Sequence, residues 1–231
     1  MIQSQRREKI KSKLLQDKSV SVSVLAASMN VSGETIRRDL EALSAEGFCK
    51  KTFGGAVLCT RSTTIVPQTV KKSLFTVEKQ QIAKIAAQSV RPNDCIFLDH
   101  STTVCAMCEE IKDMPLTVVT NSVSVLQELN GCAGITVVLT GGQLGAAEQG
   151  LFGQETLKFL NTHFFDKAFF SCRGIHMQQC TFDSTEQIAA LHQALLNRSA
   201  EHFLLVDHTK FGICGFTNMT SSFTELQNLI T

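Results

Sequence analysis

One stretch, residues 21–57, constrains the fold of this chain more than any other part of the sequence. Its pattern predicts a short helix, a turn with Ser32 as an N-cap, and a second helix that begins at Glu34. Apolar residues recur in the second helix at i, i+4 and i+7, so they share one buried stripe. These residues are Ile36, Leu40 and Leu43. Two short helices joined by a tight turn are typical of a helix-turn-helix.

The outer face of the second helix carries Thr35, Arg37 and Arg38, which cannot lie on the buried stripe. A recognition helix presents such side chains, near its start, to base edges and phosphates in the major groove of DNA. The same residues also fit an ordinary solvated face, on which Arg37 and Glu41 form an i,i+4 ion pair. The helix alone leaves both interpretations open.

A basic hairpin after this helix favours DNA binding. Gly47 is expected to end the helix, and residues 48–53 read as a strand that carries two adjacent lysines. The two glycines that follow tolerate the positive φ of a reversal, and residues 56–58 return as the partner strand. The combination predicts a winged helix-turn-helix that binds double-stranded DNA. The predicted DNA contacts are Ser32, Thr35, Arg37, Arg38, Lys50, Lys51, Gly54 and Gly55.

Charge is unevenly distributed along the sequence. Residues 1–60 hold ten lysines and arginines against six acidic residues, a net charge of +4, whereas residues 61–231 hold twelve against fifteen, a net charge of −3. A basic N-terminal part followed by a mildly acidic remainder is typical of a nucleic-acid-binding domain joined to a domain of another kind. We expect a DNA-binding domain over residues 1–58, a polar linker over 59–75 and a second domain over 76–231. The first helix is expected over 4–17, with Ile10, Leu14 and Leu15 facing the core and Arg6, Arg7, Lys9 and Lys11 facing outward.

Composition also excludes several classes of protein. No apolar run approaches the ~18 residues that span a membrane, and the N-terminus lacks the apolar core of a signal peptide. We therefore expect a cytoplasmic protein with no membrane partner, associated with the nucleoid when it binds DNA. The nine cysteines are scattered and odd in number, which favours reduced thiols over a disulfide framework. Cys105 and Cys108 form a CxxC near His100, but without a second ligand pair at zinc spacing we expect no metal and no other cofactor.

The second domain alternates helical patterns with short apolar runs, which predicts an open, mainly parallel α/β sheet. The first helix is expected over 76–90, with Ile82, Ile85, Ala86 and Val90 on its buried side. The predicted strands are 95–98, 116–120, 135–139, 167–170 and 202–206. The helices between them are predicted near 103–112, 122–130, 153–162 and 184–199.

Polar residues follow the predicted strands, and ligands of such sheets bind at the carboxyl ends of the strands. Hydroxyls and backbone N–H groups there suit a phosphate, Lys210 or Arg173 supplies counter-charge, and Asp99 and Asn121 suit sugar hydroxyls. Taken singly, these segments also fit ordinary helix caps, turns and surface residues. The predicted ligand-binding residues are Asp99, Ser101, Thr102, Thr103, Asn121, Ser122, Gly141, Gly142, Arg173, Gly174, Asp207 and Lys210.

The sequence resembles the DeoR-type bacterial transcription regulators. The resemblance is dense in VSGETIRRDLEALSAEGF and FGGA, and it continues more weakly in DHSTT, TNS, the Gly-Gly pair after the third strand, DKAFFSCRGI and DHTKFG. It implies a second domain related to ribose-5-phosphate isomerase and a phosphorylated sugar or polyol as the inducer. It further implies a repressor of a carbohydrate operon that binds operator DNA as a homo-oligomer, either a dimer or a tetramer.

Three positions depart from the family pattern. His100-Ser101 replaces a smaller pair before the double threonine, and Gln179-Cys180 stands where a glycine turn is common. The sequence stops at FTELQNLIT, where family members usually continue with an aspartate and a further short segment. Two alternatives follow from this comparison: the protein is naturally short, or its end is missing. Both leave open whether the second domain has the strand or helix that braces the ligand site.

An enzyme is the alternative interpretation of the second domain. A sugar-phosphate isomerase with a nucleic-acid-binding head would use Asp99, Asp183 or Asp207 as its general base. The sequence offers no carboxylate and lysine paired at a catalytic spacing, and a shared fold does not imply shared chemistry. A regulator is therefore the favoured interpretation.

Overall fold

The computed structural model describes residues 2–45, 48–58, 68–178 and 180–231. The chain divides into two compact units, Met1–Leu74 and Phe75–Thr231, each described here by itself. Gly47, predicted to end the second helix, and most of the predicted linker lie outside the described residues. The part of the linker that the structure describes contains a short helix, α4 (Gln68–Lys72). The sequence had predicted a polar linker without a helix there.

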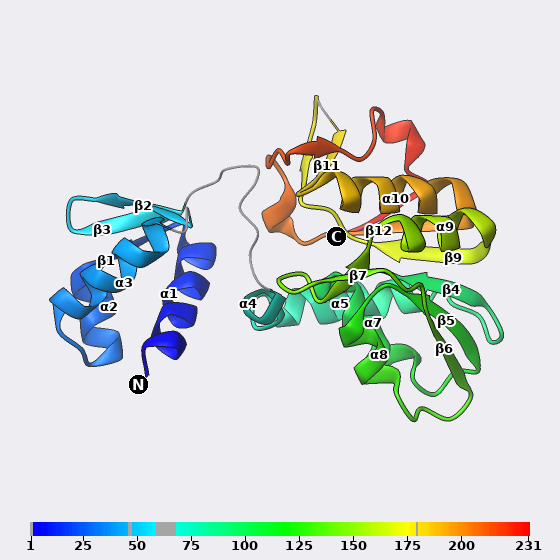
Figure 1. Cartoon of the computed structure of the whole chain (residues 1–231), viewed down its shortest axis with the longest axis horizontal. Helices are drawn as coiled ribbons and strands as arrows, with labels where there is room; N and C mark the ends of the chain where they lie inside the picture. Colours follow the sequence, from blue (N-terminus) through cyan, green and yellow to red (C-terminus); the bar gives the residue numbers. More distant parts are fainter. Residues whose placement is uncertain (1, 46–47, 59–67, 179) are drawn as a thin grey trace. The chain divides into compact units, whose positions relative to one another are not determined.

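The first unit is a winged helix-turn-helix, as predicted (Figure 1). Its helices are α1 (Gln3–Asp17), α2 (Val22–Met29) and α3 (Gly33–Ala45), and its strands are β1 (Ser19–Ser21), β2 (Cys49–Thr52) and β3 (Gly55–Leu58). The strands form one antiparallel sheet in the order β1-β3-β2. The stripe predicted on α3 is confirmed, because its residues are buried with apolar side chains from α1 and α2. The core comprises Ile10, Leu14, Val22, Leu25, Ile36, Leu40, Leu43, Phe48, Cys49 and Ala56.

Two adjacent glycines shape the turn of the wing for different reasons. Gly54 has a φ of +81° with open space around it, so the backbone conformation is what requires glycine. At Gly55 an added Cβ would lie 2.0 Å from the carbonyl oxygen of Val20, because β1 packs directly against this position. Packing within the first unit therefore explains why position 55 is a glycine. A direct DNA contact by Gly54 or Gly55 stays a prediction.

Gly55→Ala is expected to destabilise the first unit by about 3 kcal/mol, because backbone rather than a flexible side chain must move to admit the methyl group. Gly54→Ala is the matched control, with an expected loss of about 1 kcal/mol from the left-handed conformation alone. Thermal unfolding of the two variants measures the difference. Equal transition temperatures for Gly55→Ala and the wild type would show that β1 does not pack as described.

The second unit is built on a six-stranded, fully parallel sheet in the order β14-β12-β9-β4-β5-β6. The strands are β4 (Cys95–Leu98), β5 (Leu116–Thr120), β6 (Ile135–Leu139), β9 (Phe165–Phe170), β12 (Ser199–Leu205) and β14 (Asn228–Ile230). The helices are α5 (Thr76–Ala87), α6 (Thr102–Cys105), α7 (Met107–Ile111), α8 (Val123–Leu129), α9 (Gln154–Thr162) and α10 (Glu186–Arg198). The prediction of an open parallel α/β domain is confirmed.

Alternate residues of the central strands enter two separate cores, one on each face of the sheet. Ile96 and Leu98 of β4 lie with α5, α6, α7 and α8, whereas Phe97 lies with α9 and α10 (Figure 1). Burial on both faces explains why these strands read as continuous apolar runs. None of the helices that the structure describes is long and apolar enough to cross a membrane.

Several details differ from the sequence predictions. Ile85 was expected on the buried side of its helix but is 50% exposed. The helix predicted over 103–112 is two short helices, α6 and α7. A hairpin, β7 (Gln143–Gly145) and β8 (Gly150–Phe152), and a small sheet, β10 (Gly174–His176), β11 (Cys180–Asp183) and β13 (Thr217–Asn218), were not predicted. Two short 3-10 helices, η1 (His208–Lys210) and η2 (Phe223–Glu225), complete the unit.

Candidate functional site

The exposed surface of α3 carries the two arginines predicted to read DNA. Arg37 and Arg38 are both exposed, and both lie near Glu34, with N–O distances of 3.4 and 3.7 Å. The predicted pair between Arg37 and Glu41 is wrong, because Glu41 instead binds Lys51 of the wing at 2.9 Å. Lys50 is exposed on the other face of β2. The guanidinium groups are therefore oriented by one acidic residue and face solvent.

Two predicted DNA contacts also cap the start of α3. The Thr35 backbone N–H donates to Ser32 Oγ at 3.2 Å, and the two hydroxyl groups lie 2.9 Å apart. This geometry is that of an N-cap, the simpler of the two interpretations of Ser32. Contact of either hydroxyl with DNA stays a prediction.

A buried ion pair fixes α3 against α1. Asp39 is fully buried on α3, where its two carboxylate oxygens accept from Arg6 Nε and, at 3.1 Å, from Arg7 Nε. The prediction that Arg6 faces outward is wrong, since only about a tenth of its side chain is exposed. Arg6 and Arg7 thus position the recognition helix. This role could not be predicted from local sequence, because both arginines lie more than 30 residues before Asp39.

The second candidate site lies where the order of the sheet reverses. From β4 the chain continues to β5 and β6 on one side and then returns to β9 on the other. Asp99 follows β4 and Ser171 follows β9, and the Ser171 backbone N–H donates to Asp99 Oδ2 at 3.0 Å. Thr120 at the end of β5 donates from its hydroxyl to the Leu98 carbonyl at 2.6 Å. Open α/β sheets bind ligands at this switch point, so the predicted strand ends do converge where a ligand site is expected.

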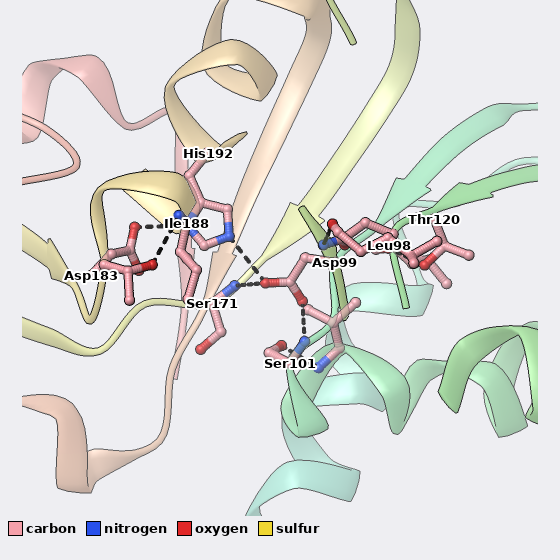
Figure 2. Close-up of polar contacts among 12 residues, drawn as sticks. Leu98, Asp99, Ser101, Thr120, Ser171, Asp183, Ile188 and His192 are labelled. Carbon is pink, nitrogen blue, oxygen red and sulfur yellow. Dashed lines mark hydrogen bonds and ion pairs between the residues drawn. The ribbon is translucent and has the colours of Figure 1, made fainter. Parts of the chain in front are cut away.

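Asp99 belongs to a buried network of three charged side chains, shown in Figure 2. His192 of α10 lies between two carboxylates, with Nδ1 2.9 Å from Asp183 Oδ2 and Nε2 3.3 Å from Asp99 Oδ2. Burial alone would lower the pKa of His192, but Asp183 and Asp99 outweigh it and raise that pKa to about 10. Burial would raise the pKa of Asp99, and the hydrogen bond from His192 reverses this, so the pKa is lowered. The network is a protonated imidazole held between two carboxylates.

Three side chains beside this network have the donor atoms of a metal site. Asp99, His100 and His192 each place a potential ligand atom within 4.8 Å of the others. Both nitrogens of His192 already contact carboxylates, at 2.9 and 3.3 Å. These hydrogen bonds account for the positions of Asp99 and His192 without a metal ion.

Two predicted ligand-binding residues present buried polar atoms without a partner among the described residues. Asn121 is fully buried and donates from Nδ2 to the Leu151 carbonyl at 3.1 Å, which leaves its Oδ1 unpaired. Arg173 has an unpaired, buried Nε, and burial lowers the pKa of its guanidinium. Buried polar atoms are rarely left without partners, so the unpaired acceptor and the unpaired donor each require a ligand atom or a water molecule.

A lysine that the sequence analysis did not single out joins this edge of the sheet. Lys79 of α5 is buried, and its pKa is lowered to about 8, chiefly by burial; Asp207 opposes the shift and Lys210 adds to it. Asp207 caps η1 by accepting from the Thr209 backbone N–H at 2.9 Å, which holds Lys210 one turn away. Lys79 lies more than 120 residues before Asp207 in the chain, so no local motif reveals it.

The remaining predicted residues have structural roles in this unit. Ser101 and Ser122 are N-caps, since each hydroxyl accepts from a backbone N–H at 3.2 Å. Gly142 and Gly174 allow close packing, because an added Cβ would lie 2.4 Å from Thr156 Oγ1 and 2.3 Å from the Ile213 carbonyl oxygen, respectively. Gly141 has a φ of +75°, Thr102 is half-buried and Thr103 is buried. A ligand contact by any of these residues stays a prediction.

Comparison with known sequences gives matches over both units. The DeoR-like helix-turn-helix domain matches residues 6–62, and the DeoR C terminal sensor domain matches residues 75–231. YulB of Bacillus subtilis (strain 168), an uncharacterized HTH-type transcriptional regulator, is 33% identical over 100% of this chain and 89% of that protein. The lactose phosphotransferase system repressor of Lactococcus lactis subsp. lactis is 33% identical over 91% of this chain and 84% of the relative.

A third relative and a solved structure also resemble this chain. The putative aga operon transcriptional repressor of Escherichia coli O157:H7 is 30% identical over 90% of this chain and 78% of that protein. The structure of ribose 5-phosphate isomerase A from Methanocaldococcus jannaschii aligns with a TM-score of 0.43 and 15% identity, over 59% of this chain and 54% of that chain.

Proposed function

Because the chain belongs to the DeoR family of helix-turn-helix transcription regulators, we propose that it represses a carbohydrate-utilisation operon and is released from DNA by a phosphorylated sugar or polyol. Membership of this family makes the chain a regulator rather than an enzyme. The alternative of an isomerase is therefore wrong, and with it the role of Asp99, Asp183 or Asp207 as a general base. Similar proteins named as a lactose phosphotransferase system repressor and a putative aga operon transcriptional repressor support a sugar-linked target.

DNA recognition is assigned to α3 and the wing. Arg37 and Arg38 project from α3 as exposed cations, and Lys50 of the wing suits a phosphate contact. Proteins of this kind bind two half-sites as dimers, so we expect a dimer or tetramer in solution, which light scattering measures. Binding of the chain to its own upstream DNA, followed by fluorescence anisotropy at two salt concentrations, tests the assignment. Affinity no greater than that for unrelated DNA would overturn it.

Effector recognition is assigned to the carboxyl-edge site, which we define as Lys79, Asp99, Asn121, Arg173, Asp207 and Lys210. The observation that carries this assignment is the pair of unpaired buried atoms, Asn121 Oδ1 and Arg173 Nε. A sugar hydroxyl satisfies the first and a phosphate oxygen satisfies the second. Lys79 and Lys210 add positive charge, which suits a dianionic phosphate ester. The effector lowers DNA affinity by binding more tightly to the conformation that does not bind DNA. The size of the effect is set by the difference in its affinity for the DNA-binding and the released conformation.

Arg173→Ala is expected to weaken binding of the effector phosphate ester by about 10- to 100-fold, because it removes a charge-assisted hydrogen bond. Operator affinity without effector should not change, since Arg173 lies in the second unit. Arg198→Ala, at an exposed position at the end of α10, is the matched control. Titration of the protein–DNA complex with the effector measures both quantities. Release at the wild-type effector concentration would exclude Arg173 from the site.

A further inference from the structure

The tip of the wing displays an aromatic side chain that neither core packing nor the predicted DNA contacts explain. Phe53, in the turn between β2 and β3, is 110% exposed relative to the reference value, more than any other large apolar side chain among the described residues. Phe48, at the base of the same hairpin, is buried in the core of the unit. A fully exposed side chain of this size forgoes the hydrophobic stabilisation that its burial would contribute. A partner that covers Phe53 would recover this stabilisation.

The turn that holds Phe53 is firmly anchored. The Val22 backbone N–H donates to the Gly54 carbonyl at 2.8 Å, and Gly55 pairs with Ser21 of β1. An added Cβ at Gly55 would lie 2.0 Å from the Val20 carbonyl oxygen, so β1 packs directly against this position. Phe53 is therefore presented on a fixed support, which reduces the conformational entropy lost when it binds a partner.

The charge around Phe53 identifies the chemistry of that partner. Lys50 and Lys51 precede it on β2, and both are exposed; Lys51 also pairs with Glu41 at 2.9 Å, and the structure gives no ion pair for Lys50 among the described residues. The lysines suit the phosphates of a nucleic acid, and the exposed aromatic ring suits the apolar faces of its bases. DNA offers both groups side by side. Phe53 also directly follows β2, the strand that carries these lysines.

We propose that Phe53 inserts into the minor groove beside the half-site read by α3 and partly unstacks one base step there. This inference rests on the proposed DNA-binding function and adds a residue that determines specificity. Apolar side chains used in this way open flexible pyrimidine–purine steps most easily. The wing thereby selects operators that carry such a step at the edge of the half-site, without a hydrogen bond to any base.

The test compares the full-length wild type with Phe53→Ala, Lys50→Ala and Phe164→Ala on the chain's own upstream DNA at four salt concentrations. Phe53→Ala is expected to bind about 10-fold more weakly with an unchanged slope of log K against log salt, because no ion pair is lost. Lys50→Ala should reduce the magnitude of that slope by about 0.9. Phe164, 62% exposed in the second unit, supplies a matched phenylalanine control that should bind like the wild type.

A second comparison replaces the pyrimidine–purine steps at the edges of the half-sites with A-tract steps. The wild type should lose about 10-fold in affinity and Phe53→Ala should lose none, because its side chain no longer opens the step. Wild-type affinity for Phe53→Ala, or equal losses on the altered DNA, overturns the insertion of Phe53 while leaving the DNA-binding function intact. A wild type that fails to bind its upstream DNA overturns the proposed function itself, and this inference with it.

Discussion

His192→Leu is expected to destabilise the second unit by about 3–5 kcal/mol, the typical cost of removing one partner of a buried ion pair. His192 is buried between Asp183, 2.9 Å from its Nδ1, and Asp99, 3.3 Å from its Nε2. Leucine leaves both carboxylates in the interior without their counter-charge. Urea unfolding at neutral pH measures the loss. His163→Leu, at an exposed histidine after α9, is the control and should stay within about 0.5 kcal/mol of the wild type.

The excess stability of the wild type over His192→Leu should also depend on pH. The pKa of His192 rises from 6.5 to about 10 on folding, so the folded state holds its proton more tightly. The excess is therefore complete below pH 6.5 and is lost as pH rises through about 10. Asp99 acts in the opposite sense, because its pKa is lowered and its contribution is lost as pH falls. A difference that stays constant between pH 6 and 10 would contradict a charged His192.

Arg38→Ala is expected to reduce operator affinity by about 10- to 100-fold, the effect of losing one good base contact. Arg38 projects from α3 near Glu34, and its side chain is 78% exposed, so its removal should leave the fold intact. Binding of sugar phosphates should not change, since that site lies in the other unit. Anisotropy on upstream DNA measures the first quantity and calorimetry the second. Unchanged operator affinity would remove Arg38 from the recognition surface.

Local periodicity was enough to predict most of the fold. The i, i+4, i+7 stripe of Ile36, Leu40 and Leu43 placed α3, and uninterrupted apolar runs placed five of the parallel strands. The strands β10 and β13 have only three and two residues, too few to carry a period, and they were missed. Ile85 was wrongly assigned to the buried side of α5. The helical period shows which residues share a face, but it does not show how much of that face the neighbouring elements cover.

Contacts distant in sequence limited the prediction of the sites. Strand ends brought Asp99, Asn121 and Asp207 to one edge by topology alone, which the rule for parallel sheets anticipates. His192 looked like one residue of an ordinary amphipathic helix, because its partners lie 9 and 93 residues away. Arg6 looked like a solvated cation for the same reason, since only the folded chain brings it to Asp39. Cys180 has a φ of +62°, which explains why a glycine suits this turn.

We propose that a phosphate ester, bound at the carboxyl-edge site, releases this regulator from DNA. Anisotropy of the whole chain on its upstream DNA, titrated with pairs of sugars or polyols that differ only in the phosphate, tests this directly. One phosphorylated member is expected to release the DNA while its unphosphorylated counterpart does not, and Arg173→Ala should raise the concentration required. Equal release by both members of the pair, or release that Arg173→Ala leaves unchanged, would contradict it.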